Sequence, residues 1–181
     1  PPRNRRFLLY EIGVDGNGLR QLTGTTADPL ATADGRRTVL IEDFDPCYLP
    51  DGGIAFISTR CQNFGRCHVQ RYNPAYVLHC MEGDGSGIRQ LSFGEANEWD
   101  PSVLADGRLI YTRWDYVNRH DTLFQSLWTM RPDGSNTAHF YGNASPNPCM
   151  TAEARSIPGE AWRVVATATA HHAYTAGSII A

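Results

Sequence analysis

The sequence predicts an all-β fold made of repeated antiparallel hairpins, and two repeated units support this prediction. The first unit is a short apolar strand, an Asp-Gly turn and a second strand, at residues 9–23, 78–92 and 127–141. Asp-Gly between apolar runs is a strong hairpin signal, because both residues tolerate positive φ. We therefore expect a tight turn at each Asp-Gly pair, with both of its residues at positive φ.

A second unit alternates with the first. An Asp-Pro pair followed by an Asp-Gly turn leads into an apolar strand at residues 45–60 and again at 100–113. A degenerate copy has its turn at 157–159 and its second strand at 164–169. The spacing between copies is irregular, which is typical of regular strands joined by loops of unequal length.

Two alternating hairpins in a period of about 40–50 residues form a four-stranded antiparallel sheet, which is the blade of a β-propeller. We interpret the chain as a fragment of such a propeller, with an outer half-blade at 7–23, a blade at 43–92, a blade at 98–141 and an incomplete blade at 146–181. The start at Pro1 instead of Met, and the end inside the apolar run 178–181, also indicate a fragment. The expected partners are the rest of the propeller, flanking domains and partner subunits.

The composition excludes several classes of protein. The net charge of −3 and the pI near 6.1 give no basic surface for nucleic acid or for an anionic membrane. The chain is 41% hydrophobic and 19% charged, which fits a globular protein and argues against disorder. Its apolar runs are shorter than the roughly 20 residues of a membrane helix, so we expect no membrane span.

The long loops are expected on one rim of the propeller and the Asp-Gly turns on the other. Loops at 61–75, at 114–125 and after residue 170 carry the candidate site residues: Cys61, Cys67, His68, Tyr72, His120, His171 and His172. Long loops on a rigid scaffold are where binding and catalytic residues concentrate. The rim that carries these loops is therefore the predicted functional face, with His120, His171 and His172 lining its pocket.

Two of the cysteines bracket a loop, whereas the others are expected to pack as small apolar residues (Cys47, Cys80 and Cys149). Three interpretations of Cys61 and Cys67 remain open. They form a disulfide in an oxidising compartment, they bind zinc with His68 and His79, or they attach a covalent c-type haem. Five residues separate the two cysteines, which is wider than the usual spacing of either zinc or haem motifs.

The repeated hairpins resemble the PD40 repeats of TolB-type propellers over most of the chain. The chain is also similar, more closely, to the propeller domain of the hydrazine synthase alpha subunit and its relatives. The stretches that carry this similarity are 45–52, 58–61, 98–101, 111–114, 127–134, 153–155 and 166–172.

The resemblance to hydrazine synthase implies a periplasmic, haem-dependent oxidoreductase that condenses hydroxylamine and ammonia to hydrazine. It makes Cys67 a haem thioether, Tyr72 the axial iron ligand and His68 a zinc ligand. Phe64 stands where the family has its first cysteine, so attachment uses either Cys61 at an unusual spacing or Cys67 alone. The resemblance to TolB-type propellers implies the alternative, a non-catalytic scaffold that binds a ligand or a protein and holds neither haem nor zinc.

A third class, the propeller of a serine peptidase, finds no support in this sequence. The chain contains no Gly-x-Ser-x-Gly motif, the strand-to-helix turn that presents a nucleophilic serine.

Overall fold

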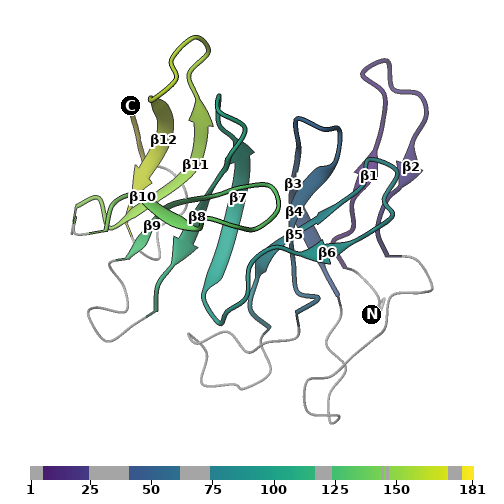
Figure 1. Cartoon of the computed structure of the whole chain (residues 1–181), viewed down its shortest axis with the longest axis horizontal. Helices are drawn as coiled ribbons and strands as arrows, with labels where there is room; N and C mark the ends of the chain where they lie inside the picture. Colours follow the sequence, from purple (N-terminus) through teal and green to yellow (C-terminus); the bar gives the residue numbers. More distant parts are fainter. Residues whose placement is uncertain are drawn as a thin grey trace.

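The structure is a computed structural model that describes residues 6–24, 41–61, 74–116, 124–143, 145, 147–170 and 177–181. Every regular element in these residues is a β-strand, which confirms the all-β prediction (Figure 1). The strands are β1 (Tyr10–Glu11), β2 (Arg20–Gln21), β3 (Asp43–Tyr48), β4 (Ile54–Ser58), β5 (Val77–Met81), β6 (Arg89–Gln90), β7 (Asn97–Val103), β8 (Leu109–Trp114), β9 (Gln125–Met130), β10 (Ala138–Tyr141), β11 (Met150–Ser156), β12 (Val164–Thr169) and β13 (Ser178–Ile180). Accordingly, no helix able to cross a membrane occurs in these ranges.

The strands form antiparallel groups in chain order. β1 pairs with β2, and β3, β4, β5 and β6 form a four-stranded sheet. β7 to β10 form a second run of four strands, and β11, β12 and β13 form a run of three. These last two runs belong to one sheet only through a single parallel pair, Met150 with Gln125. All six predicted hairpins are present in the described residues.

The Asp-Gly turns form as predicted, but the prediction for the φ of their Asp residues is wrong. The glycines have positive φ, for example 91° at Gly85 and 87° at Gly134, whereas none of the turn Asp residues does. Instead the Asp carboxylate accepts the backbone N–H two residues later, as Asp84 does from Ser86 at 2.8 Å. This side-chain-to-backbone hydrogen bond, an Asx-turn, stabilises the turn without a left-handed conformation at the Asp residue. The same bond forms at the other turn residues, Asp15, Asp51, Asp106 and Asp133.

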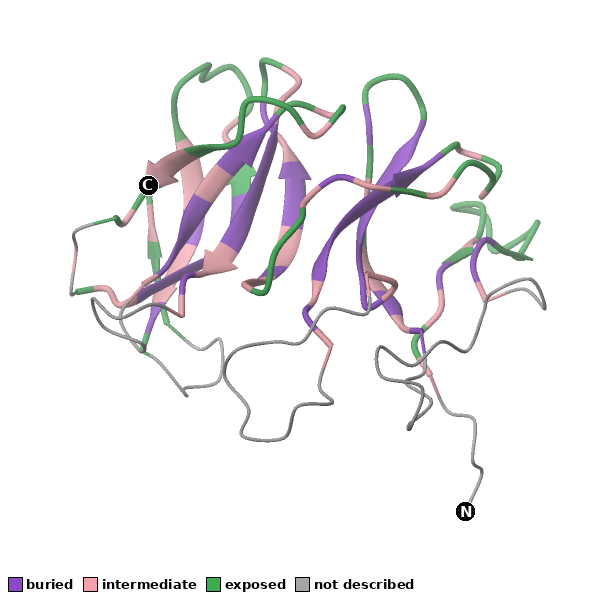
Figure 2. Cartoon of the chain, turned by 60° about the horizontal axis from the view of Figure 1, so that its bottom comes forward, coloured by how far each residue is buried: buried purple, intermediate pink, exposed green. Residues whose placement is uncertain are grey.

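The core lies between the faces of successive sheets (Figure 2). Alternate residues of one strand face opposite neighbours, as the two-residue period of a strand requires. In β4, Ile54 and Phe56 pack toward β1 and β2, whereas Ala55 and Ile57 pack toward β8 and β9. β4 consequently contributes apolar side chains to two layers of the core.

The three cysteines expected to pack as apolar residues lie in or beside strands. Cys80 is buried in β5, and Cys47 is half-buried against the same cluster. Burial raises the pKa of the Cys47 thiol to about 11, so this thiol remains protonated at neutral pH. Cys149 is half-buried, and its Sγ lies 3.7 Å from the Thr169 carbonyl oxygen.

Candidate functional site

Most of the residues that the sequence assigns to the site lie outside the described residues: Cys67, His68, Tyr72, His120, His171 and His172. Cys61 is described. It follows β4, is half-buried, and its Sγ lies 3.5 Å from the carbonyl oxygen of Ala75. This contact brings the two ends of the 61–75 loop together. Within the described ranges, no three His, Cys, Asp or Glu side chains converge to hold a metal ion.

His79, the further zinc ligand considered from the sequence, is a core residue of β5. It is 3% exposed, its ring lies 5.9 Å from that of Phe56, and its Nδ1 lies 3.0 Å from the Val77 carbonyl oxygen. Burial lowers the pKa of its imidazole and therefore favours the neutral ring.

A repeated acidic bulge marks the first strand of three alternate hairpins, β3–β4, β7–β8 and β11–β12. Asp45 in β3, Asp100 in β7 and Glu153 in β11 have φ of 50°, 54° and 56°. Each of these residues lies where the pairing register with the next strand shifts, which is a β-bulge. The acidic residue therefore occupies the bulge at the equivalent position of all three strands. A left-handed conformation costs a non-glycine residue roughly 1–2 kcal/mol, and such strain is concentrated at functional sites.

The three acidic bulges are linked through the backbone. The N–H of Asp100 donates to Oδ2 of Asp45 at 3.3 Å, and the backbone of Glu153 donates to the Asp100 carboxylate in the same way. Burial, followed by the charges of Asp45 and Glu153, raises the pKa of Asp100 to about 6, although Arg155 opposes the shift. The strands β3, β7 and β11 that carry these residues lie next to one another (Figure 1).

A pocket of about 310 Å³ opens beside the first of these bulges. Its described lining residues are three aromatic and two acidic residues: Phe7, Phe44, Tyr76, Glu42 and Asp45. The rings of Phe44 and Tyr76 meet edge to face, with centroids 5.5 Å apart. Burial and the nearby Glu42 raise the pKa of Tyr76, so its hydroxyl remains protonated. Aromatic faces next to carboxylates attract organic cations.

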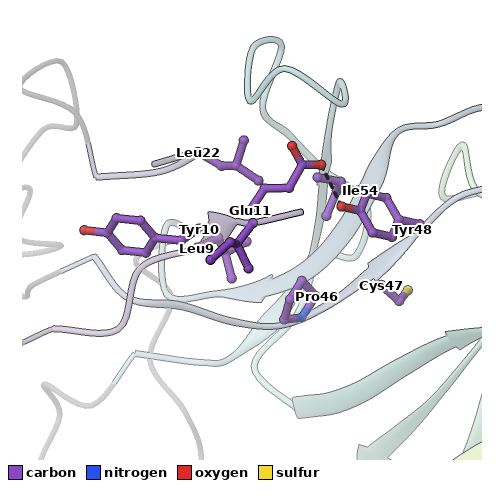
Figure 3. Close-up of a pocket in the computed structure, with 9 residues that line it drawn as sticks. Leu9, Tyr10, Glu11, Leu22, Pro46, Cys47, Tyr48 and Ile54 are labelled. Carbon is purple, nitrogen blue, oxygen red and sulfur yellow. Dashed lines mark hydrogen bonds between the residues drawn. The ribbon is translucent and has the colours of Figure 1, made fainter. Parts of the chain in front are cut away.

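A second pocket, of about 230 Å³, lies between β1 and β3 (Figure 3). Its lining includes the apolar residues Leu9, Leu22 and Ile54, two tyrosines, Tyr10 and Tyr48, and one charged polar group. The polar group is Glu11, which accepts hydrogen bonds from Arg20 Nε and from the hydroxyl of Tyr48, both at 2.6 Å. These bonds lower the pKa of Glu11, with Arg20 as the larger cause.

The sequence alone predicts neither the acidic bulges nor the aromatic pocket. The Asp-Pro pairs at 45–46 and 100–101 were recognised only as markers of the repeat. The repetition of an acidic residue before Pro is the signal that could have located the first two bulges, whereas Glu153 precedes an alanine. The pocket had no comparable signal, because Phe7 and Tyr76 come from segments that are far apart in the sequence.

Comparison with solved structures finds a similar fold in a TolB-like protein from Agrobacterium tumefaciens. The TM-score is 0.52 at 18% sequence identity, over 74% of this chain and 40% of the other. The likeness supports a TolB-like all-β fold and does not show closeness to hydrazine synthase. The chain spans about 40% of the length of that structure. No family model and no curated protein matches the chain.

Proposed function

We propose that the chain is part of a TolB-type β-propeller that acts as a binding scaffold for a positively charged group. The four-stranded sheet β3–β6, the antiparallel run β7–β10 and the TolB-like neighbour support the propeller assignment. The blade boundaries expected from the sequence are part of this proposal. The same neighbour is consistent with a periplasmic location.

The observation that carries the binding proposal is the pocket beside Asp45. Two acidic residues and three aromatic residues line it. Carboxylates and aromatic rings both attract cations. Asp45 lies beside the pocket, where its bulge and the hydrogen bond from the Asp100 N–H hold it. Its carboxylate is therefore positioned before a ligand arrives. The side chain of a lysine or arginine in a peptide has the size and charge for this site.

A fluorescence-polarisation titration with a labelled hexa-lysine peptide tests this proposal. The variant Glu42→Gln/Asp45→Asn should bind about tenfold or more weakly, because both carboxylates are removed while shape and backbone bonding are kept. Asp133→Asn/Glu160→Gln makes the same change of charge at exposed turns and should bind like the unmodified protein. Equal loss in both variants would mean that only net charge matters, and the pocket assignment would be rejected.

The haem interpretation is a second proposal, favoured by the order Cys67, His68 and Tyr72 in the sequence. Of the proposed attachment residues the structure describes Cys61 alone, so the fit of a haem depends on residues outside the described ranges. A bound haem would supply iron at which hydroxylamine and ammonia give hydrazine and water. A pyridine haemochrome assay after expression with cytochrome c maturation proteins should show a covalent haem that Cys67→Ala abolishes. A colourless folded protein would exclude this function and leave a disulfide as the role of Cys61 and Cys67.

A further inference from the structure

A third pocket, of about 440 Å³, lies where turns of two successive runs of strands meet, beyond the Tyr48 end of β3. Its lining comes from the β3–β4 turn, from β6 and from the turns of the β7–β8 and β9–β10 hairpins. It shares no lining residue with the aromatic pocket beside Asp45. Its charged lining residues are Asp51, Arg89, Asp106, Arg108, Arg131 and Asp133.

The repeat shows why space is left between these turns. A Cβ at Gly83 would lie 2.6 Å from the carbonyl oxygen of Gly52, so the two turns of the β3–β6 sheet are in close contact. Pro132 takes the place of Gly83 in the next copy of the repeat, and a proline carries a ring at that point. The β7–β8 and β9–β10 turns therefore cannot approach each other as closely, and Gly107 and Pro132 both line the pocket.

The first arginine of the pocket, Arg89, lacks the carboxylate that its equivalent has. Arg20 and Arg89 have the same position in the repeat, and each donates to a carbonyl of the following hairpin. Arg20 lies opposite Glu11 in the paired strand and forms an ion pair with it at 2.6 Å. Arg89 lies opposite Cys80, which offers no charge to pair with.

The β9–β10 turn adds a second arginine without a carboxylate partner. Arg131 stands where the β5–β6 hairpin has Glu82, and it is exposed. Its guanidinium forms no hydrogen bond or ion pair with any residue that the structure describes. Arg108, in contrast, pairs with Asp106 at 2.7 Å. Two changes in the same direction, at Cys80 and at Arg131, thus leave a pair of guanidinium groups beside one pocket.

The acidic residues of the pocket limit the charge of an anion that fits it. Asp51 and Asp133 each use one carboxylate oxygen within their own turn, accepting the backbone N–H of Gly53 at 3.0 Å and of Ser135 at 2.8 Å. Their negative charges remain close to the pocket and repel an anion in proportion to its charge. A singly charged anion is therefore favoured over a doubly charged one.

We propose that this pocket binds a carboxylate of an acidic peptide, the side chain of an aspartate or glutamate, through Arg89 and Arg131. A guanidinium group donates two parallel hydrogen bonds to a carboxylate, which makes arginine well suited to this ligand. Arg89 uses one donor on the Pro132 carbonyl and keeps the others. The volume of about 440 Å³ is typical of ligand pockets and leaves room for a side chain with part of its backbone. The site is separate from the cation pocket and does not depend on it.

The test is an NMR titration of nitrogen-15-labelled protein with the blocked peptide acetyl-Gly-Glu-Gly-amide at about pH 6.5, where the glutamate is ionised. The backbone N–H signals of Gly107 and Gly134 and the Nε–H signals of Arg89 and Arg131 should shift and saturate. The corresponding glutamine peptide should bind at least about tenfold more weakly, because it lacks the charge. Sulfate, a doubly charged oxyanion, should also bind more weakly than the glutamate peptide.

Variants assign the binding to the two arginines. Arg89→Gln/Arg131→Gln should weaken binding of the glutamate peptide at least about fivefold. Arg20→Gln/Arg163→Gln is the matched control, since it makes the same change of charge and removes the equivalent bond to the following hairpin, and it should bind like the unmodified protein.

Asp51→Asn should instead tighten binding about twofold, because it removes a repelling charge and keeps the oxygen that accepts from Gly53. A misfolded variant would not gain affinity, so this result does not depend on the stability of the arginine variants.

Equal weakening in both double variants would mean that only net charge matters and would overturn the proposal. Equal binding of the glutamate and glutamine peptides would overturn it as well. Tighter binding of sulfate than of the glutamate peptide would assign the pocket to inorganic oxyanions and reject the peptide carboxylate.

Discussion

The second layer of the core, between the β3–β6 sheet and the β7–β10 strands, is closed, whereas the β1–β2 hairpin is open on its outer side. Met130 of β9 is fully buried in the closed layer, and Ile12 beyond β1, at the same position of the repeat, is 54% exposed. The turns differ in the same way. A Cβ at Gly134 would lie 2.7 Å from the Leu91 carbonyl oxygen, whereas a Cβ at Gly16 would meet nothing within 4 Å.

This difference shows which properties belong to the repeat and which to its neighbours. The turn, the positive φ of its glycine and the strand alternation are the same in both regions, because they depend on a few adjacent residues. Burial differs because it depends on a preceding sheet. Arg20 and Arg89 each donate to a carbonyl of the following hairpin, those of Gly83 and Pro132, so the stacking contact itself is repeated.

The largest expected effect contrasts the two equivalent apolar positions. Met130→Ala should lower the free energy of unfolding by about 3 kcal/mol, because it leaves a cavity in a closed layer. Ile12→Ala should change it by less than about 0.5 kcal/mol, because its side chain is largely in water. Urea denaturation measures both, and equal losses would contradict the contrast between closed and open layers.

An effect of similar size concerns Asp43 and Glu98, two carboxyls at the same position of β3 and β7. Asp43 pairs with Arg60 at 2.7 Å, whereas buried Glu98 accepts hydrogen bonds from the Leu78 N–H and the Ser92 hydroxyl. Burial raises the pKa of Glu98 to about 7 from 4.5. The unfolded chain therefore loses this proton at lower pH than the folded chain, and stability should fall by about 3 kcal/mol between pH 4.5 and 7.

The variant Glu98→Gln should remove most of this fall and leave the smaller contribution of Asp100, whose pKa is raised to about 6. Asp43→Asn is the matched control and should instead destabilise the protein at pH 7, because it leaves Arg60 without its carboxylate. Denaturation midpoints at pH 5 and pH 7.5 distinguish these outcomes. If the stability of Glu98→Gln still fell steeply between pH 5 and pH 7.5, the titrating group would be a residue other than Glu98.

The sequence was sufficient for the hairpins, because an Asp-Gly pair between apolar runs is local information. It was insufficient for the conformation of Asp84, where the carboxylate bonds to Ser86 and removes the need for positive φ. The bulge at Asp45 depends on which residues of β4 pair with β3, and that register is not visible in one strand alone. The site loops contain few strand signals, so their chemistry remains a prediction from motif and resemblance.

The most direct test of the account is the hexa-lysine titration repeated at low and high salt. We predict binding that weakens with salt, because charges at a half-open pocket are screened, and a tenfold or larger loss in Glu42→Gln/Asp45→Asn relative to Asp133→Asn/Glu160→Gln. The same affinity in both variants would contradict a specific cation site beside Asp45, and the scaffold would then have to bind through another surface.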